Sequence, residues 1–128
     1  MGPRAASTST SRKTEQDKLV AAFARLLRER YGARVFLFGS RARGTARPDS
    51  DYDLVAVAEA FSQQSVFERA LDRRQLWRQA GGWGIGLDLH CYTPSEFRRQ
   101  LKGLGYLGQA KRRGELIEVA RPAATKHQ

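Results

Sequence analysis

The stretch Val35-Phe36-Leu37-Phe38-Gly39-Ser40-Arg41-Ala42-Arg43-Gly44-Thr45, followed by Ser50-Asp51-Tyr52-Asp53-Leu54, decides how this chain of 128 residues folds. The apolar run before Gly39 predicts a buried strand that ends at a tight Gly-Ser turn. Two carboxylates then alternate around Tyr52 and open a second apolar strand, Leu54 to Val57. The sequence therefore predicts that a glycine turn and a carboxylate pair meet at the ends of two neighbouring strands.

Each half of this stretch has a chemical use. Gly39 has no Cβ, so a ligand can approach its backbone, and Ser40 adds a hydroxyl and an N–H group. A short helix starting near Arg41 would point its free N–H groups at the same ligand. Asp51 and Asp53 share one face of an extended chain at about 6–7 Å spacing and can bracket Mg²⁺, which favours carboxylates together with substrate phosphates. The combination predicts a site for a metal-bound nucleoside triphosphate, although either half alone could be ordinary turn chemistry.

A third carboxylate lies on a later predicted strand, Ile85 to Tyr92. Its odd-numbered residues are apolar, whereas Asp88 and His90 fall on the opposite face. An Asp between apolar neighbours is unfavourable unless it is paired or binds metal, so we expect Asp88 to join Asp51 and Asp53. The alternative is an edge-strand Asp that faces water. His90 is expected to be a supporting or half-exposed group, with a general base as its alternative role.

These segments resemble a known superfamily. Gly39-Ser40, ten intervening residues and Asp51-x-Asp53 resemble the signature of the DNA polymerase beta-type nucleotidyltransferases. The string GSRARGTARPDSDYDL resembles their small prokaryotic branch, the minimal nucleotidyltransferases, and GLDLHCYTPSEF resembles the segment that carries their third acid. The resemblance extends from about Glu15 to Val119. It implies an α+β nucleotidyltransferase fold, in which a small mixed sheet of three to four strands packs against helices.

The resemblance also implies an activity and a set of site residues. AMP would pass from ATP to an acceptor hydroxyl, namely a tyrosine of a partner HEPN-domain toxin, so that the chain acts as an antitoxin. The implied metal ligands and catalytic residues, for two Mg²⁺ ions, are Asp51, Asp53 and Asp88. The implied phosphate contacts are Gly39, Ser40 and Arg43, with Arg41 as a weaker candidate. A salt bridge that fixes the loop is the alternative role for Arg43.

Two other classes of function stay open. A non-catalytic module could neutralise a partner protein by contact alone, and a nucleic-acid-binding protein would suit the net charge of +10. Between Glu96 and Glu115 every charged side chain is basic. A solvated helix face is the favoured interpretation of this run, and a footprint for an acidic partner or a polynucleotide is the alternative. The run consists of Arg98, Arg99, Lys102, Lys111, Arg112 and Arg113.

Composition limits the class of protein. A hydrophobic content of 41% and a charged content of 28% are typical of a soluble globular domain, and no segment approaches the length of a membrane span. The polar Met1–Lys13 stretch lacks the apolar core of a secretory signal. Cys91 is the only cysteine, which excludes an internal disulfide and a cysteine-ligated zinc site. These features favour a cytoplasmic protein.

The predicted organisation is a single nucleotidyltransferase domain over residues 14–120, between a disordered tail, 1–13, and a C-terminal tail, 121–128. Thr14 is expected to cap the first helix and Gly32 to end it. Thr93-Pro94-Ser95-Glu96 predicts a capping box. The second helix is expected to bury Val66, Phe67, Ala70, Leu71 and Trp77. The predicted helices cover 14–31, 64–80, 94–102 and 106–113, with a helical turn at 41–45, and the predicted strands cover 34–38, 52–58, 85–92 and 115–120.

Overall fold

A computed structural model describes residues 18–119, apart from the side chains of Val66, Ala70 and Leu71. The predicted tails, 1–13 and 121–128, and the Thr14 cap therefore lie outside the described residues. Within them, no helix has the length and the apolar character needed to cross a membrane.

Helices and strands follow one another closely along the chain. The first helix covers residues 18–31 of the described part, and Gly32 follows it with a φ of 69°, as predicted for a helix stop. The later elements, in order, are β1 (Arg34–Phe38), α2 (Ser40–Arg43), β2 (Tyr52–Val57), the 3₁₀ helix η1 (Glu59–Gln63), α3 (Val66–Ala80), β3 (Leu87–Tyr92), α4 (Pro94–Lys102), α5 (Tyr106–Arg112) and β4 (Ile117–Glu118).

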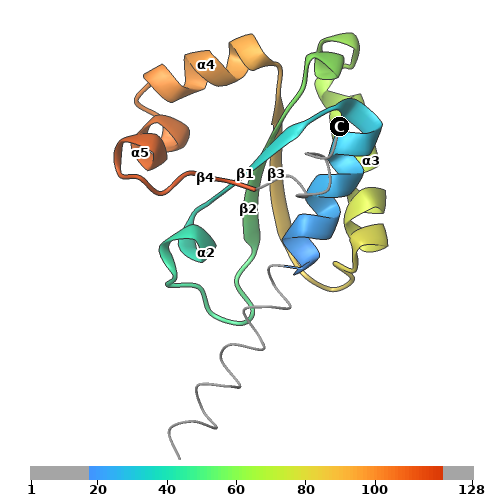
Figure 1. Ribbon diagram of the computed structural model, residues 1–128, viewed down its shortest axis with the longest axis horizontal. Helices are drawn as coiled ribbons and strands as arrows, with labels where there is room; N and C mark the ends of the chain where they lie inside the picture. The colour runs from blue at the N-terminus through green and yellow to red at the C-terminus, as the bar shows by residue number, and fades with distance from the viewer. Residues whose placement is uncertain (1–17, 120–128) are drawn as a thin grey trace, which may run out of the picture.

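The four strands form one mixed sheet in the order β3-β2-β1-β4 (Figure 1). β1 runs antiparallel to both β2 and β4, whereas β2 and β3 are parallel. A parallel pair needs a crossover connection, which η1 and α3 provide. The predicted fold, a small mixed sheet of three to four strands packed against helices, is confirmed with four strands.

Helices cover both faces of the sheet. The helix over 18–31 and α3 lie on one side, and α4 and α5 lie on the other (Figure 1). We call these sides the α3 face and the α4 face. Among the described residues, the α3 face buries fifteen, including Phe23, Leu54 and Trp77. The core on the α4 face consists of Phe36, Phe38, Val55, Val57, Phe97, Leu107 and Ala110.

Two capping boxes fix where α3 and α4 begin. At the start of α3, the Ser65 hydroxyl accepts from the Glu68 N–H while the Glu68 carboxylate accepts from the Ser65 N–H. Thr93 and Glu96 form the same reciprocal pair at α4, which confirms the predicted box. The cap at Ser65 also explains why α3 begins at Val66 rather than at the predicted residue 64.

The predicted buried set of α3 is partly wrong. Trp77 is buried and packs edge-on against Phe23, with ring centroids 4.9 Å apart, but Phe67 is 76% exposed. Phe67 precedes the buried Leu76 by nine residues, which turns a helix through about 180°. The two side chains therefore point in opposite directions. Val66, Ala70 and Leu71, the other members of the predicted set, have side chains outside the described part.

The third strand also begins later than predicted. Gly84 has a φ of 72°, and the Ile85 N–H donates to the Gly82 carbonyl at 3.1 Å. This turn keeps Ile85 out of the sheet, so β3 starts at Leu87. The predicted strand over 115–120 shrinks to β4, the expected helical turn over 41–45 is α2, and η1 was not predicted.

Candidate functional site

The sheet register brings three strands together where β1 ends. Phe38, the last residue of β1, pairs with Asp53 on β2, and Asp53 pairs with Asp88 on β3. Register partners project to the same face of a sheet, so Asp88 lies beside Asp53 on the α4 face. The alternation of the third strand predicted this face for Asp88. Two carboxylates on adjacent strands form the centre of the candidate site.

The environment of Asp88 differs from the one assumed in the sequence argument. β3 is an edge strand, and the Asp88 side chain is 57% exposed. The expectation that Asp88 would be costly without a partner is therefore wrong, because water reaches the carboxylate. Its partner among the described residues is His90, whose Nε2 lies 3.3 Å from Asp88 Oδ1.

Gly39 forms the wall of the site next to Asp53. Its φ of 76° lies in the left-handed region, a backbone conformation that residues other than glycine adopt only with strain. A Cβ on Gly39 would come within 2.3 Å of Asp53 Oδ2. The Gly39 carbonyl accepts from the N–H groups of Ala42 and Arg43, which starts α2. Glycine is thus required both by the backbone and by the neighbouring carboxylate.

Asp51 occupies the other end of the carboxylate pair. It immediately precedes β2, is exposed, and lies against the start of β3. A Cβ on Gly86 would come within 1.9 Å of Asp51 Oδ1. The Gly86 carbonyl also accepts from the Tyr52 N–H at 2.9 Å, which locks this corner of the sheet. Each carboxylate of the Asp51-Tyr52-Asp53 segment therefore rests against a glycine.

The carboxylates make the site electrostatically negative. Burial raises the pKa of Asp53 above its ordinary value, and the negative charges of Asp88 and Asp51 raise it further. His90 and Arg43 act in the opposite direction. Asp53, the least exposed of the three, thus feels both of the others, and a bound cation would offset their mutual repulsion.

Four rings form a shelf beside the carboxylates, and we call them the aromatic shelf: Phe38, His90, Tyr92 and Tyr106. The His90 ring is 5.1 Å from Tyr106 and stacks at 10° to Tyr92 with centroids 6.4 Å apart. The Tyr92 and Tyr106 hydroxyls lie 3.0 Å apart. Burial, the Tyr92 hydroxyl and then the charges of Asp88 and Asp53 raise the pKa of Tyr106. Tyr106 is therefore a site residue that the sequence reasoning missed.

Arg41 fastens a loop instead of reaching the site. Its guanidinium donates to the Ser50 carbonyl at 2.6 Å and to the Pro48 carbonyl at 3.4 Å. The same group lies 3.9 Å from the centre of the Tyr52 ring. These contacts hold the segment that leads into Asp51, so Arg41 supports the carboxylates indirectly.

Arg43 and Ser40 lie on α2, directly after the glycine turn. An Arg43 nitrogen is 3.8 Å from Glu115 Oε1, and the Arg43 side chain is 43% exposed. This separation is long for a salt bridge, so the guanidinium can turn toward an anionic ligand. Ser40 is the first residue of α2, where N–H groups lack partners inside the helix. The predicted phosphate contacts of both residues remain predictions.

The carboxylates suit a metal that is shared with a ligand. Among the described residues, no three His, Cys, Asp or Glu side chains converge closely enough to hold a metal ion by themselves. Mg²⁺ is typically bound by one or two carboxylates together with water and substrate phosphates. The all-oxygen donor set of Asp51, Asp53 and Asp88, and the repulsion that raises the pKa of Asp53, fit such an ion.

A comparison with protein families shows the family to which this chain belongs. The model of the family described as nucleotidyltransferase domain matches residues 18–119. A solved structure of a candidate nucleotidyltransferase from Sulfolobus solfataricus is similar, at 24% identity and a TM-score of 0.49. That similarity covers 67% of this chain and 74% of the other. A search of curated proteins found no match.

Proposed function

Because the chain belongs to the nucleotidyltransferase domain family, we propose that it transfers a nucleoside monophosphate from ATP to an acceptor hydroxyl. One observation supports this proposal above the others. The glycine turn after β1, Asp53 and Asp88 meet on one face of the sheet, with Asp51 at its rim. A triphosphate bound at the turn would lie directly beside the carboxylates.

The backbone around Gly39 is proposed to bind the donor. Without a Cβ at this position, a phosphate can approach the turn and the N–H groups at the start of α2. Ser40 adds its hydroxyl, and Arg43 adds a guanidinium whose planar fork suits phosphate oxygens. These groups would hold the β- and γ-phosphates and leave the α-phosphorus facing the carboxylates.

We propose that two Mg²⁺ ions bind to the carboxylates of Asp51, Asp53 and Asp88. The bound metal would neutralise the charge that develops on the phosphate oxygens and would lower the pKa of the acceptor hydroxyl. Asp53 must be ionised to take part, and its raised pKa means that acid removes this function earlier than for an ordinary carboxylate.

The exposed Asp88 is proposed to receive the acceptor proton. One of its carboxylate oxygens contacts His90 Nε2, which fixes its orientation. The two lone pairs of the other oxygen are then available to a bound Mg²⁺ and to the acceptor hydroxyl. The acceptor oxygen bonds to the α-phosphorus, the bond to the bridging oxygen breaks, and pyrophosphate leaves. Most of the rate enhancement would come from positioning and charge stabilisation.

The acceptor and the partner are proposed from the resemblance alone. A tyrosine hydroxyl of a HEPN-domain protein would be the acceptor, and its modification would make this chain an antitoxin. Co-incubation of the two proteins with ATP labelled at the α-phosphate should then label the partner. An unlabelled partner beside an otherwise active enzyme would remove the antitoxin proposal and leave the transfer proposal standing.

The direct test of transfer is the release of pyrophosphate in the presence of Mg²⁺. We expect activity in the wild type and a loss of at least about a hundredfold in Asp53→Asn and in Asp88→Asn, since each removes a charge from the reacting centre. Asp49→Asn, in the exposed loop before the site, is the matched control and should stay active. Equal rates in Asp53→Asn and the wild type would exclude the proposed centre.

A non-catalytic binding module is the second candidate. The high exposure of Asp88 favours it, because an exposed carboxylate cluster needs no metal for the protein to fold. The same assay separates the two candidates. A binding module would neutralise its partner equally well with Asp53→Asn and without nucleotide.

A further inference from the structure

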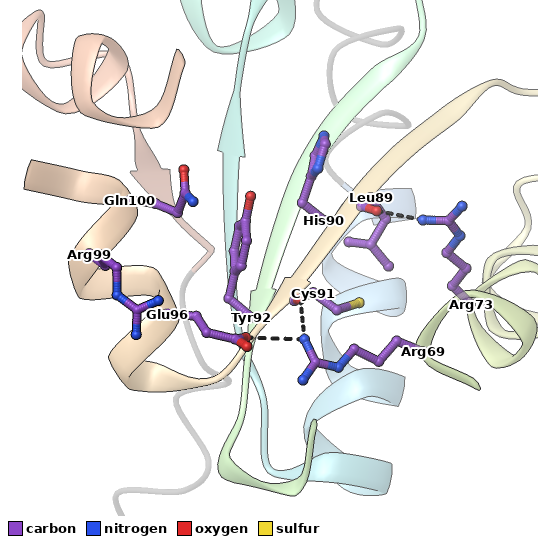
Figure 2. Close-up of a pocket in the computed structure, with 9 residues that line it drawn as sticks. All are labelled: Arg69, Arg73, Leu89, His90, Cys91, Tyr92, Glu96, Arg99 and Gln100. Carbon is purple, nitrogen blue, oxygen red and sulfur yellow. Dashed lines mark hydrogen bonds and ion pairs between the residues drawn. The ribbon is translucent and has the colours of Figure 1, made fainter. Parts of the chain in front are cut away.

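A hollow opens on the outer edge of β3, between α3 and α4 (Figure 2). It has a volume of about 460 Å³, within the range of about 300–1,000 Å³ typical of small-molecule sites. Three arginines from the two helices, Arg69, Arg73 and Arg99, line it against one carboxylate, Glu96. We call this hollow the β3 pocket.

The arginines on α3 close the edge of the sheet. Arg73 donates to the Leu89 carbonyl at 2.6 Å, and Arg69 donates to the Cys91 carbonyl at 2.9 Å. Both carbonyls belong to β3, the edge strand, and they are therefore occupied. An added strand would have to displace two charged hydrogen bonds, so the β3 pocket is not suited to strand pairing.

The three arginines differ in how many hydrogen bonds they already make. Arg69 is 12% exposed and donates to Phe61 and Cys91 carbonyls and to the Glu96 carboxylate, so it is a structural group. Arg73 uses one donor on Leu89. The Arg99 side chain makes no hydrogen bond or ion pair within the part of the chain that the structure describes. A guanidinium carries five N–H donors, which leaves most of those on Arg73 and Arg99 available to a ligand.

The β3 pocket adjoins the candidate site through two shared residues. His90 and Tyr92 line the pocket, and both belong to the aromatic shelf beside Asp88. Figure 2 shows the two rings rising from β3, with Arg99 and Gln100 of α4 on one side and Arg73 of α3 on the other. A molecule bound between Arg73 and Arg99 would therefore lie beside His90, whose Nε2 is 3.3 Å from Asp88 Oδ1.

We propose that the β3 pocket binds an anionic group of the acceptor, a phosphate or a carboxylate, and thereby presents the acceptor hydroxyl to Asp88. This inference rests on the proposed function. Guanidinium forks bind both kinds of oxyanion through paired hydrogen bonds. The excess of cations over the single carboxylate, Glu96, which already pairs with Arg69, favours an anion over a neutral ligand.

The first test is a titration with inorganic phosphate, in which the NMR signals of the arginine Nε–H groups report binding. The titration is done without metal or nucleotide and at constant ionic strength. We expect saturable shifts at Arg73, Arg99 and the His90 ring. Arg99→Gln should weaken phosphate binding about tenfold, equivalent to about 1.4 kcal/mol. Because the Arg99 side chain contacts no described residue through a hydrogen bond, this variant should fold normally.

Neighbouring arginines supply matched controls. Arg74→Gln on α3 and Arg98→Gln on α4 are exposed and lie outside the pocket, so phosphate affinity should not change in either. Arg73→Lys keeps the charge but loses the fork, and it should also weaken binding. Non-saturating shifts of equal size at Arg74 and Arg98, or an Arg99→Gln protein with wild-type affinity, would overturn the proposal.

The second test repeats the titration with Mg²⁺ and α,β-methylene-ATP, whose α–β linkage is not cleaved. An acceptor pocket should bind phosphate with the nucleotide in place. Competition between the two would assign the arginines to the triphosphate and overturn the acceptor proposal. If the analogue does not bind at all, the proposed function fails, while the first titration still decides whether the pocket binds anions. A parallel titration with acetate distinguishes a phosphate from a carboxylate. The anion that binds more tightly indicates which of the two groups the acceptor carries.

Discussion

The two faces of this sheet are built from the same strands but serve different purposes. On β2, Tyr52, Leu54 and Ala56 point to the α3 face, and all three are almost fully buried. The alternate residues begin with Asp53, which is half-buried, and continue with the buried Val55 and Val57 on the α4 face. The residues of β2 on the α3 face are apolar along the whole strand. On the α4 face, the carboxylate of Asp53 is followed two residues later by the buried Val55.

This difference shows how a small domain combines stability with a charged site. The α3 face supplies the larger core, so the α4 face can leave one end open to solvent and ligand. The aromatic shelf lies at the boundary, since Phe38 belongs to the core while Tyr106 is 40% exposed. Changes to the first face should therefore alter stability, and changes to the open end should alter ligand binding.

The largest expected effect comes from the α3 face. Leu54 is fully buried, so Leu54→Ala should lower the free energy of unfolding by about 2–5 kcal/mol through lost burial and a cavity. Urea unfolding measures this loss as a lower midpoint. Leu104→Ala is the control, because Leu104 is 86% exposed and its truncation should change stability by less than about 0.5 kcal/mol. Similar losses in both variants would mean that the α3 face is not the main core.

An intermediate effect is expected at the glycine turn. Gly39→Ala forces a side chain into a φ of 76° and toward the Asp53 carboxylate, whereas Gly44→Ala meets a φ of 80° with nothing within 4 Å. Both should lose about 1 kcal/mol from backbone strain. Only Gly39→Ala should also lose Mg²⁺-dependent nucleotide binding, measured by calorimetry. Intact binding in Gly39→Ala would show that the ligand does not approach this turn.

The smallest effect on stability is expected at Asp53. Asp53→Asn removes one charge from three like charges, so the melting temperature of the apo protein at pH 7 should hold or rise. The sign follows from the raised pKa of Asp53. A carboxylate whose pKa is raised by folding favours the folded state below its ordinary value of 3.8 and loses that contribution as pH rises through the raised value.

The melting temperatures of Asp53→Asn and the wild type should therefore converge as pH falls toward 4. Calorimetry from pH 4 to 8 measures this convergence, with Asp49→Asn as a control that should track the wild type throughout. A much lower melting temperature for Asp53→Asn at pH 7 would mean that the Asp53 carboxylate is a structural group.

Local signals in the sequence predicted much of this fold. The apolar run before Gly39 predicted the bounds of β1, and the Thr93–Glu96 capping box predicted where α4 begins. The alternation of the third strand predicted that Asp88 and His90 share the face opposite to its apolar residues. These features depend on neighbouring residues along the chain, and for that reason the sequence was sufficient to predict them.

Features that depend on tertiary contacts were not predictable in the same way. Nothing in its own segment shows that β3 lies at the sheet edge, so an edge-strand Asp88 that faces water was given only as the alternative. Tyr106 stands on α5, whereas the other three rings stand on β1 and β3. Its contact with Tyr92 requires α5 to fold back over the sheet. Arg41 was considered as a phosphate ligand because a sequence does not show that its side chain turns back to the Ser50 carbonyl.

The most direct test of the central claim is the thermal stabilisation of the protein by ATP with Mg²⁺ and with EDTA. If the carboxylates bind the triphosphate through metal, ATP at a hundred times its dissociation constant should add about 2.7 kcal/mol with Mg²⁺ and much less with EDTA. Asp53→Asn should lose most of this difference. In about 0.3 M salt, which screens loose surface contacts, the metal-dependent gain should persist. A gain that is the same without Mg²⁺ and vanishes in that salt would mean adsorption to the basic surface and would contradict the proposed site.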